Sequence, residues 1–233
     1  MQSEYELKPG IYLVPTPIGN LDDITVRALK VLSNTDVIAC EDTRHSGSML
    51  KHYKIVPKKL ISYHEHNEDK QTHGLIEVAK EKSIAVISDA GSPGISDPGY
   101  KLVQKAIESG VYITSLPGAT AFVPALTLSG MEMSEFTFYG FPPQKKGRKS
   151  FLKKVSKCNT VAILYESPYK IVKLLDELIE VCGVEREIAL IREISKIHEE
   201  VIRGSLEEVK KVFEKKQAKG EFVVVLKNIN ESN

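Results

Sequence analysis

The sequence predicts an α/β fold of two domains, the first with a parallel sheet covered by helices and the second with a mixed sheet. Over the first half of the chain, short apolar runs alternate with longer segments of helical periodicity, as expected of parallel strands joined by crossover helices. In the second half, only a short polar loop separates the apolar runs around Ile191 and Ile202. Because no crossover helix fits there, these two strands are expected to be antiparallel. The 233 residues suffice for two cores, and we place the domains at 1–117 and 118–233.

Five apolar runs of the first half are expected to be strands. The first run ends at Pro15, and the next segment carries Ala28 and Leu32 on one helical face. A second helical segment, rich in Glu and Lys, precedes the fourth run. Asp97 followed by Pro98 resembles an N-cap with a proline in the first turn, which predicts a helix from there to about residue 108. In chain order, the expected strands are 11–14, 36–40, 59–63, 84–88 and 111–116.

The second half contains five more apolar runs and two signals for helix starts. Ser205 and Glu208 have the spacing of a capping box, which opens the final helix. Ser167 and Pro168 fit the N-cap and first turn of a long helix with an apolar face. In chain order, the expected strands are 136–141, 161–165, 188–191, 201–204 and 222–226.

The composition excludes several classes of protein. A net charge of +1 excludes a polycation that coats nucleic acid, although it leaves room for a local basic patch. The three cysteines lie far apart in the sequence, so we expect no disulfide framework and a reducing compartment. No signal peptide is recognisable, and no apolar run approaches the roughly 20 residues that cross a bilayer. We therefore expect a cytoplasmic protein without a membrane partner.

Three loops built from Gly, Pro and small residues follow predicted strands of the first half, at 15–20, 89–94 and 117–121. Ligands of an open parallel sheet bind beyond the carboxyl ends of its strands, and small residues let the main chain approach a ligand closely. A tight turn is the plain alternative for any one of these loops, but three at one edge favour a binding crevice. The segment 91–99 is neither a Walker loop nor a dinucleotide-binding turn. The loops therefore indicate a small ligand held by backbone groups.

Charged side chains follow the second and third predicted strands. Glu41, Asp42 and Arg44 could serve acid–base chemistry or grip a phosphate. The alternative is a local salt bridge with a helix cap by Asp42 or Thr43. His64 is a candidate polar group at the rim of the crevice. A His-x-Glu pattern just after it lacks the cysteine pair that a zinc deaminase requires, so we expect no metal site.

Seven cationic residues crowd into one short stretch of the second half, directly after aromatic residues and a Pro-Pro break. A phosphate backbone attracts such a cluster. The alternative is the solvated face of a helix, with Phe151, Leu152 and Val155 on its buried side. The two interpretations are compatible, and the local concentration of charge favours a contact with RNA or phosphate. The cationic residues are Lys145, Lys146, Arg148, Lys149, Lys153, Lys154 and Lys157.

Three motifs in the first half resemble those of a known superfamily. The segment PTPIGNL at 15–21 resembles the first motif of the tetrapyrrole methylases, whose members use S-adenosylmethionine. SDAGSP at 88–93 is similar to their acidic-glycine loop, and PGATA at 117–121 is similar to their third motif.

Within that superfamily, the chain resembles one branch in particular. EDTR at 41–44, SPGISDPG at 92–99 and YESP at 165–168 are similar to the branch that methylates ribosomal RNA, the small-subunit rRNA (cytidine-2'-O)-methyltransferase I family. The likeness extends over about 10–227, and the motifs occur in the family's order.

The resemblance implies a homodimer of two-domain chains with S-adenosylmethionine in the cleft between the domains. The methyl group would go to the ribose 2'-oxygen of a cytidine in the decoding region of the small ribosomal subunit. A base that takes the hydroxyl proton would help this transfer, and the candidates are Glu41, Asp42 and His64. The expected RNA contacts are Arg44, Lys145, Lys146, Arg148 and Lys149. The residues expected to line the cofactor pocket are Ile18, Asp89, Gly91, Ser92, Thr120, Ala121 and Tyr165.

Two alternative functions remain open from the sequence. One is a C-methyltransferase of the same fold that acts on a tetrapyrrole precursor, against which the EDTR motif and the lysine cluster weigh. The other is a non-catalytic RNA-binding module whose crevice is vestigial.

Overall fold

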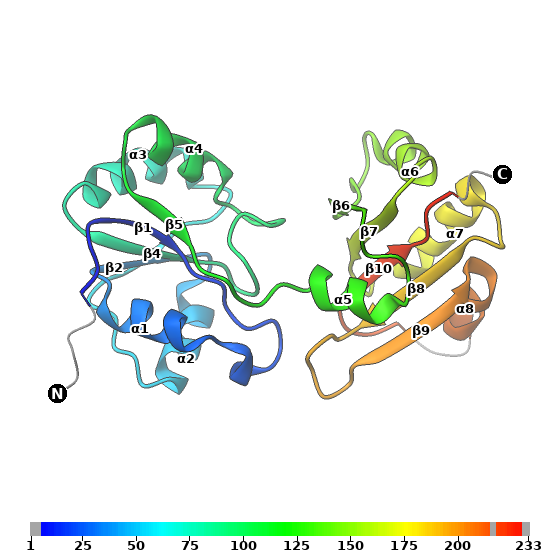
Figure 1. Cartoon of the computed structure of the whole chain (residues 1–233), viewed down its shortest axis with the longest axis horizontal. Helices are drawn as coiled ribbons and strands as arrows, with labels where there is room; N and C mark the ends of the chain where they lie inside the picture. Colours follow the sequence, from blue (N-terminus) through cyan, green and yellow to red (C-terminus); the bar gives the residue numbers. More distant parts are fainter. Residues whose placement is uncertain (1–5, 215–217, 230–233) are drawn as a thin grey trace. The chain divides into compact units, whose positions relative to one another are not determined.

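The structure is a computed structural model that describes residues 6–214 and 218–229, and it divides into two compact units, residues 1–120 and 121–233 (Figure 1). Each unit contains one five-stranded sheet with helices packed against it. The predicted α/β fold class, with a parallel and a mixed sheet, is confirmed.

The first unit is built on a fully parallel sheet. Its strands are β1 (Gly10–Leu13), β2 (Val37–Cys40), β3 (Leu60–Ser62), β4 (Ser83–Ile87) and β5 (Ile113–Ser115). They lie in the order β3-β2-β4-β1-β5, and all four neighbouring pairs are parallel. All five carboxyl ends, and the loops that follow them, therefore meet at one edge.

Helices cover both faces of this sheet, which explains its continuous apolar strands. They are α1 (Val26–Asn34), α2 (Thr43–His52), α3 (Glu68–Ala79) and α4 (Tyr100–Glu108), with a short 3₁₀ helix at Leu21–Asp23. Ile11 and Leu13 of β1 pack in one core with α3 and α4, and Tyr12 and Val14 pack in the other with α1 and α2. Figure 1 shows the two pairs of helices on opposite sides of the sheet.

The second unit is built on a mixed sheet with the strand order β6-β7-β10-β8-β9. Only β6 and β7 are parallel neighbours, and β8 and β9 are antiparallel as predicted. Side chains of α6, α7 and α8 share one core with alternate residues of the strands, while α5 packs against β8 and β10. None of the described helices is long and apolar enough to cross a bilayer. The elements are β6 (Phe136–Gly140), β7 (Val161–Glu166), β8 (Glu187–Arg192), β9 (Glu200–Ser205), β10 (Phe222–Leu226), α5 (Phe122–Ser129), α6 (Arg148–Ser156), α7 (Ile171–Cys182) and α8 (Leu206–Glu214).

The capping box at the start of α8 is confirmed, whereas both proline-based helix starts are wrong. Ser205 N–H donates to Glu208 Oε2 at 2.8 Å, and Glu208 N–H donates to Ser205 Oγ at 3.2 Å. The helix after Ser167 begins only at Ile171, because Ser167 O first accepts a turn hydrogen bond from Lys170 N–H at 3.1 Å.

The helix expected from Asp97 begins instead at Tyr100, with Gly99 as its cap residue. Gly99 has a φ of +146° and donates its N–H to Glu68 Oε1 at 3.0 Å. A buried carboxylate from α3 thus takes the place of the expected Asp97 cap. This leaves the Asp97 side chain free to face another part of the unit.

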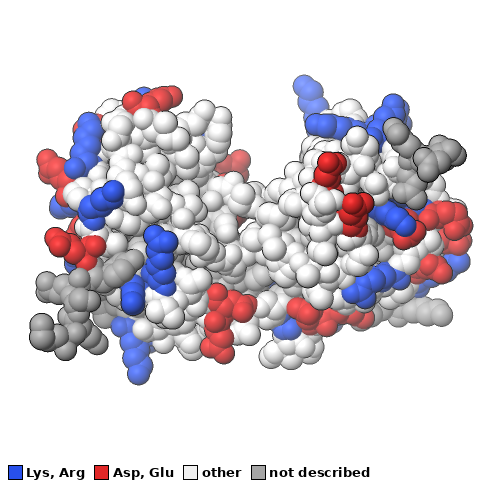
Figure 2. Space-filling view, viewed as in Figure 1, with Lys and Arg blue, Asp and Glu red and all other residues white. Residues whose placement is uncertain are grey.

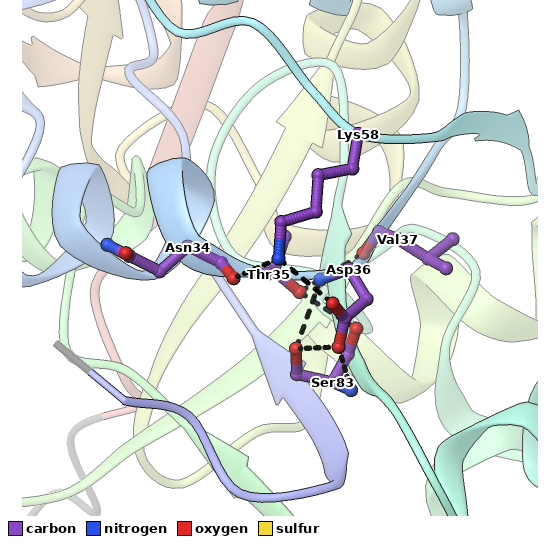
Figure 3. A network of polar contacts seen from close by, with 6 residues as sticks. All are labelled: Asn34, Thr35, Asp36, Val37, Lys58 and Ser83. Carbon is purple, nitrogen blue, oxygen red and sulfur yellow. Dashed lines mark hydrogen bonds and ion pairs between the residues drawn. The ribbon is translucent and has the colours of Figure 1, made fainter. Parts of the chain in front are cut away.

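A polar network joins β2 to β4 at their amino ends, opposite the edge with the three loops of small residues (Figure 3). The Asp36 carboxylate accepts hydrogen bonds from Lys58 Nζ at 3.0 Å, from Ser83 N–H at 3.0 Å and from Ser83 Oγ at 2.8 Å. These bonds, led by that from Lys58, lower the pKa of Asp36 to about 2. The charged form of Asp36 therefore holds the two strands together.

Replacing Asp36 with Asn is expected to destabilise the first unit at neutral pH by about 1 kcal/mol, a modest value because the side chain is partly exposed. The folded pKa lies below the unfolded value of about 3.9. The stabilisation is therefore present above pH 4 and is lost as the pH falls towards 2. Thermal unfolding of both proteins between pH 2 and 7 should show a difference that closes on acidification. A constant difference would contradict this, and Asp69→Asn, at an exposed ion pair, is the control.

Candidate active site

The three loops of small residues are tied together at the carboxyl edge of the first sheet. They follow β1, β4 and β5, which are neighbours in the sheet. Thr16 and Gly91 exchange two backbone hydrogen bonds, each 2.9 Å long. Ser92 Oγ donates to Ala119 O at 3.0 Å, which joins the loop after β4 to the loop after β5. The edge is therefore a preorganised surface of backbone groups.

Two glycines are required by this arrangement. A Cβ at position 118 would lie 2.5 Å from Pro15 Cβ, so only glycine allows the first and third loops to touch. Gly91 has a φ of +85°, and a Cβ there would point at Ile18 Cγ2, 3.5 Å away. At position 118 a larger residue would push the first and third loops apart, whereas at position 91 it would strain the backbone, because L-residues rarely adopt that φ.

Asp42 and Arg44 form the salt bridge and cap that the sequence offered as the alternative to a chemical role. Asp42 Oδ1 accepts from Arg44 N–H at 2.8 Å and from His45 N–H at 3.4 Å at the start of α2, and Asp42 Oδ2 lies 3.0 Å from Arg44 Nη2. The hydrogen bonds from Arg44 lower the pKa of Asp42 to about 2. A carboxylate held so strongly in its ionised form is a weak proton acceptor. Arg44 itself is exposed.

Asp89 belongs to the loop after β4 and contacts the start of α2. Its carboxylate Oδ1 accepts from Asp42 N–H at 3.2 Å, and its carbonyl oxygen lies 3.1 Å from His45 Nε2. Glu41, at the end of β2, has its pKa raised by burial and then by the charge of Asp89. The charge of Asp89, which follows β4, therefore acts on Glu41, which follows β2.

Asp97 joins this acidic group, although its place before Pro98 predicts a helix cap. Burial, followed by the charge of Glu41, raises the pKa of Asp97 to about 6; the charge of Asp89 adds to this, and a hydrogen bond with Ser88 opposes it. The preceding residue, Ser96, has a φ of +64°, a left-handed conformation that non-glycine residues rarely adopt. The available signal was an acidic residue in a strand-end loop rich in glycine, which the N-cap interpretation of Asp97 obscured.

His64 follows β3 at the same edge. Its N–H donates to Asn67 Oδ1 at 2.8 Å, and its positive form would lower the pKa of Glu41. Among residues 6–214 and 218–229, His64 Nδ1 is one of three buried side-chain polar atoms without a hydrogen-bond partner. The same part of the chain contains no group of three His, Cys, Asp or Glu side chains that could hold a metal ion.

The remaining residues of the expected cofactor pocket lie after β5 and in the second unit. Thr120 is the last residue of the first unit, and Ala121 precedes α5. Tyr165 lies on β7, where its hydroxyl oxygen accepts from Phe122 N–H at 3.2 Å. Its ring packs edge-on against that of Phe141, with centroids 5.4 Å apart.

Arg148, which the sequence predicts to contact RNA, has a buried side chain that is engaged within the second unit. Its Nε donates to Glu177 Oε2 at 2.7 Å and its Nη1 to Pro143 O at 3.2 Å, while Nη2 lies 3.5 Å from Glu166 Oε2. Arg148 precedes Leu152 by four residues, so the helical period itself places it on the buried face of α6. The six lysines of the stretch are exposed, and Figure 2 shows cationic side chains gathered over the part of the second unit where Figure 1 places α6.

Comparison with known proteins identifies the class of protein to which this chain belongs. Residues 10–210 match the model of the family Tetrapyrrole (Corrin/Porphyrin) Methylases. The chain is similar in structure to diphthine synthase, with a TM-score of 0.72 and 17% identity over 93% of this chain and 89% of that one. It is also similar to uroporphyrin-III C-methyltransferase from Thermus thermophilus, with a TM-score of 0.63 and 20% identity over 94% of both chains. The fold and the matched family are those of methyltransferases.

Sequence comparison narrows the class. A Thermotoga maritima protein named ribosomal RNA small subunit methyltransferase I is 42% identical over 93% of this chain and 97% of that protein. Proteins of the same name from Hydrogenobaculum sp. and Bacillus subtilis are each 44% identical over 94% of this chain, covering 96% and 75% of their own lengths. The chain belongs to the ribosomal RNA small subunit methyltransferase I family, and the resemblance stated from its motifs is confirmed.

Proposed function

We propose that the protein transfers a methyl group from S-adenosylmethionine to the ribose 2'-oxygen of a cytidine in the decoding region of small-subunit ribosomal RNA. The observation that carries this proposal is the identity of 42–44% with relatives of that name along nearly the whole chain. The EDTR motif at 41–44 supports the finer specificity through its resemblance to the cytidine-2'-O branch. A ribosomal substrate would place the enzyme in the cytoplasm.

The first unit has groups suited to S-adenosylmethionine, which supplies a methyl group on a positively charged sulfur. The backbone cradle at Gly91 and Ile18 offers close approach without side-chain bulk. Asp89 contributes negative charge at the same edge, which favours a cationic ligand. We propose that Ile18, Asp89, Gly91, Ser92 and Thr120 hold the cofactor at this edge. Ala121 and Tyr165, which belong to the second unit, are proposed as cofactor-binding residues from the family resemblance alone.

The reaction needs orientation and a proton acceptor. Orientation of two reactants can supply an effective molarity of about 10⁵ M or more, and the tied loops provide a rigid surface for it. The 2'-hydroxyl becomes a good nucleophile when a nearby group accepts its proton, which is worth about 10²- to 10⁴-fold. Glu41 and Asp97 have raised pKa values, so each binds a proton more tightly than an ordinary carboxylate. We propose Asp97 as the acceptor, with the charge of Glu41 acting on Asp97 and that of His64 acting on Glu41.

The substrate side of the proposal assigns RNA contacts to exposed cations. Lys145 and Lys146 precede α6, Lys149 lies in its first turn, and Arg44 lies in the first turn of α2. These positively charged side chains attract the negatively charged phosphate backbone, and the attraction weakens with added salt. We also propose that the chain functions as a homodimer, which light scattering of the purified protein would test.

A methylation assay with mapping tests the proposed function. Small ribosomal subunits that lack the modification are incubated with the protein and radiolabelled S-adenosylmethionine, and the labelled nucleotide is located. We expect label on one cytidine ribose. Label on a tetrapyrrole precursor instead would support the C-methyltransferase alternative. No heat of S-adenosylmethionine binding in calorimetry would support the non-catalytic RNA-binding alternative.

A further inference from the structure

The parallel pair of β6 and β7 brings two loops to one edge of the second sheet. β6 ends at Gly140, which pairs in register with Leu164 two residues before the end of β7. Because parallel strands have their carboxyl ends at the same edge, the loops leaving them are neighbours. Phe141 begins the first loop, and Tyr169 lies in the second.

Both of these aromatic side chains are exposed. Phe141 is 57% exposed and Tyr169 is 94% exposed. The ring of Phe141 packs against Tyr165 at an interplanar angle of 65°, so its orientation is held while much of its surface faces solvent. Exposed rings of this kind are stacking surfaces for unpaired bases.

The charge around these rings is positive and is not neutralised locally. The segment 141–157 contains no Asp or Glu. Arg148 is paired with the buried carboxylate of Glu166 and the partly buried carboxylate of Glu177. Among the ion pairs of the described residues, none includes the three lysines at the start of α6, where the helix dipole disfavours cations and favours phosphate. These lysines are Lys145, Lys146 and Lys149.

We propose that this aromatic–lysine edge, made of Phe141, Tyr169, Lys145, Lys146 and Lys149, binds single-stranded RNA. The rings stack on unpaired bases while the lysines contact phosphates. Duplex RNA conceals its base faces, so it gains the phosphate contacts alone. The inference rests on the proposed function and deepens it, because it assigns the form of RNA that is recognised and the residues that recognise it.

Binding measurements with ring variants test the stacking part. The affinity of the full chain for a short fluorescent oligouridine and for an RNA hairpin is measured by anisotropy. Phe141→Leu and Tyr169→Ala are each expected to weaken oligouridine binding by about 5- to 100-fold and to leave hairpin binding nearly unchanged. Ile197→Ala, at a side chain that is 98% exposed, is the matched control and should bind as the wild type does. The high exposure of Tyr169 means that its variant should fold normally.

The salt dependence of binding tests the charged part. Each phosphate contact contributes about 0.7 to the slope of log affinity against log salt for a single strand. Lys145→Glu with Lys146→Glu is therefore expected to reduce the slope by about 1.4. Lys70→Glu with Lys82→Glu, two exposed lysines of the first unit, should leave the slope unchanged.

The outcomes separate this inference from the proposed function. If the wild type methylates small subunits but both ring variants bind oligouridine normally, the RNA-binding role of the aromatic–lysine edge is wrong and the proposed function stands. If oligouridine binding depends on the rings but no RNA is methylated, the edge stands and the proposed function fails. Tighter ring-dependent binding to anionic phospholipid vesicles than to oligouridine would assign the edge to a membrane surface and overturn the inference.

Discussion

Replacement of Asp97 by Asn is expected to lower the rate of methyl transfer by about 10²- to 10⁴-fold while leaving S-adenosylmethionine affinity near that of the wild type. The amide retains the shape of the side chain but cannot accept the hydroxyl proton. In the wild type, kcat should rise with pH through about 6, the pKa to which burial and the charge of Glu41 raise Asp97. The variant should lose this dependence. Single-turnover rates with small subunits between pH 5 and 8 measure both effects.

Three variants distinguish Asp97 from its neighbours in the same assay. Glu41→Gln and His64→Ala change the charges that act on Asp97 or on Glu41, so they should shift the pH dependence and retain most of the rate. Asp69→Asn makes the same chemical change at an exposed site and should behave as the wild type does. Wild-type turnover in Asp97→Asn would show that the proton acceptor is another group or that none is needed.

Asp97→Asn is expected to lower activity but to raise the stability of the folded protein above pH 6. The folded pKa of Asp97, about 6, exceeds the unfolded value of about 3.9. The wild type therefore gains stability as the pH falls through 6 and loses it as the pH rises. An asparagine avoids the charge that is unfavourable above pH 6. Asp97→Asn should unfold at a higher temperature than the wild type at pH 8, and the difference should disappear near pH 4.

Replacement of Arg148 by Met is expected to destabilise the second unit by about 3–5 kcal/mol. The change leaves Glu166, which is only 4% exposed, without its cation, and it leaves Glu177 with only Lys173, whose Nζ lies 3.9 Å from Glu177 Oε1. A buried carboxylate without a partner carries a large desolvation cost. Denaturation in urea measures the free energy of unfolding of the variant and the wild type.

Two further variants separate the ion pair from the loss of the side chain itself. Lys149→Met, at the exposed next position of α6, should change stability by less than about 0.5 kcal/mol. Adding Glu166→Gln to Arg148→Met removes one uncompensated charge and should restore part of the stability. Equal stabilities of Arg148→Met and Lys149→Met would contradict a structural role for Arg148.

The positions of the strands were predictable because buried strands have a recognisable local pattern of apolar residues. Strands covered on both faces, such as β4, appear as continuous apolar runs. The starts of α4 and α7 were mispredicted because a serine or aspartate before proline fits both a cap and a turn. At α4 the cap residue is Gly99 rather than Asp97, and Gly99 N–H donates to Glu68, a residue distant in the sequence.

The candidate site was predictable in part. The three loops of small residues and Glu41 were found because strand ends of a parallel sheet must share an edge. Asp97 was missed because its proton affinity depends on Glu41 and Asp89, which chain folding brings near it. Arg148 was assigned to RNA because cationic residues of one cluster look alike when their burial is ignored.

By itself, the sequence determined the fold class, the strand-end loops and the family, because hydrophobic period and motif order are local properties of the chain. Only the tertiary structure decided which charges are available for chemistry. It made Asp97 a proton acceptor candidate and buried Arg148 between two glutamates. The physical reason is that burial and neighbouring charge set the energy of an ionisable group, and both are contributed by residues far away along the chain.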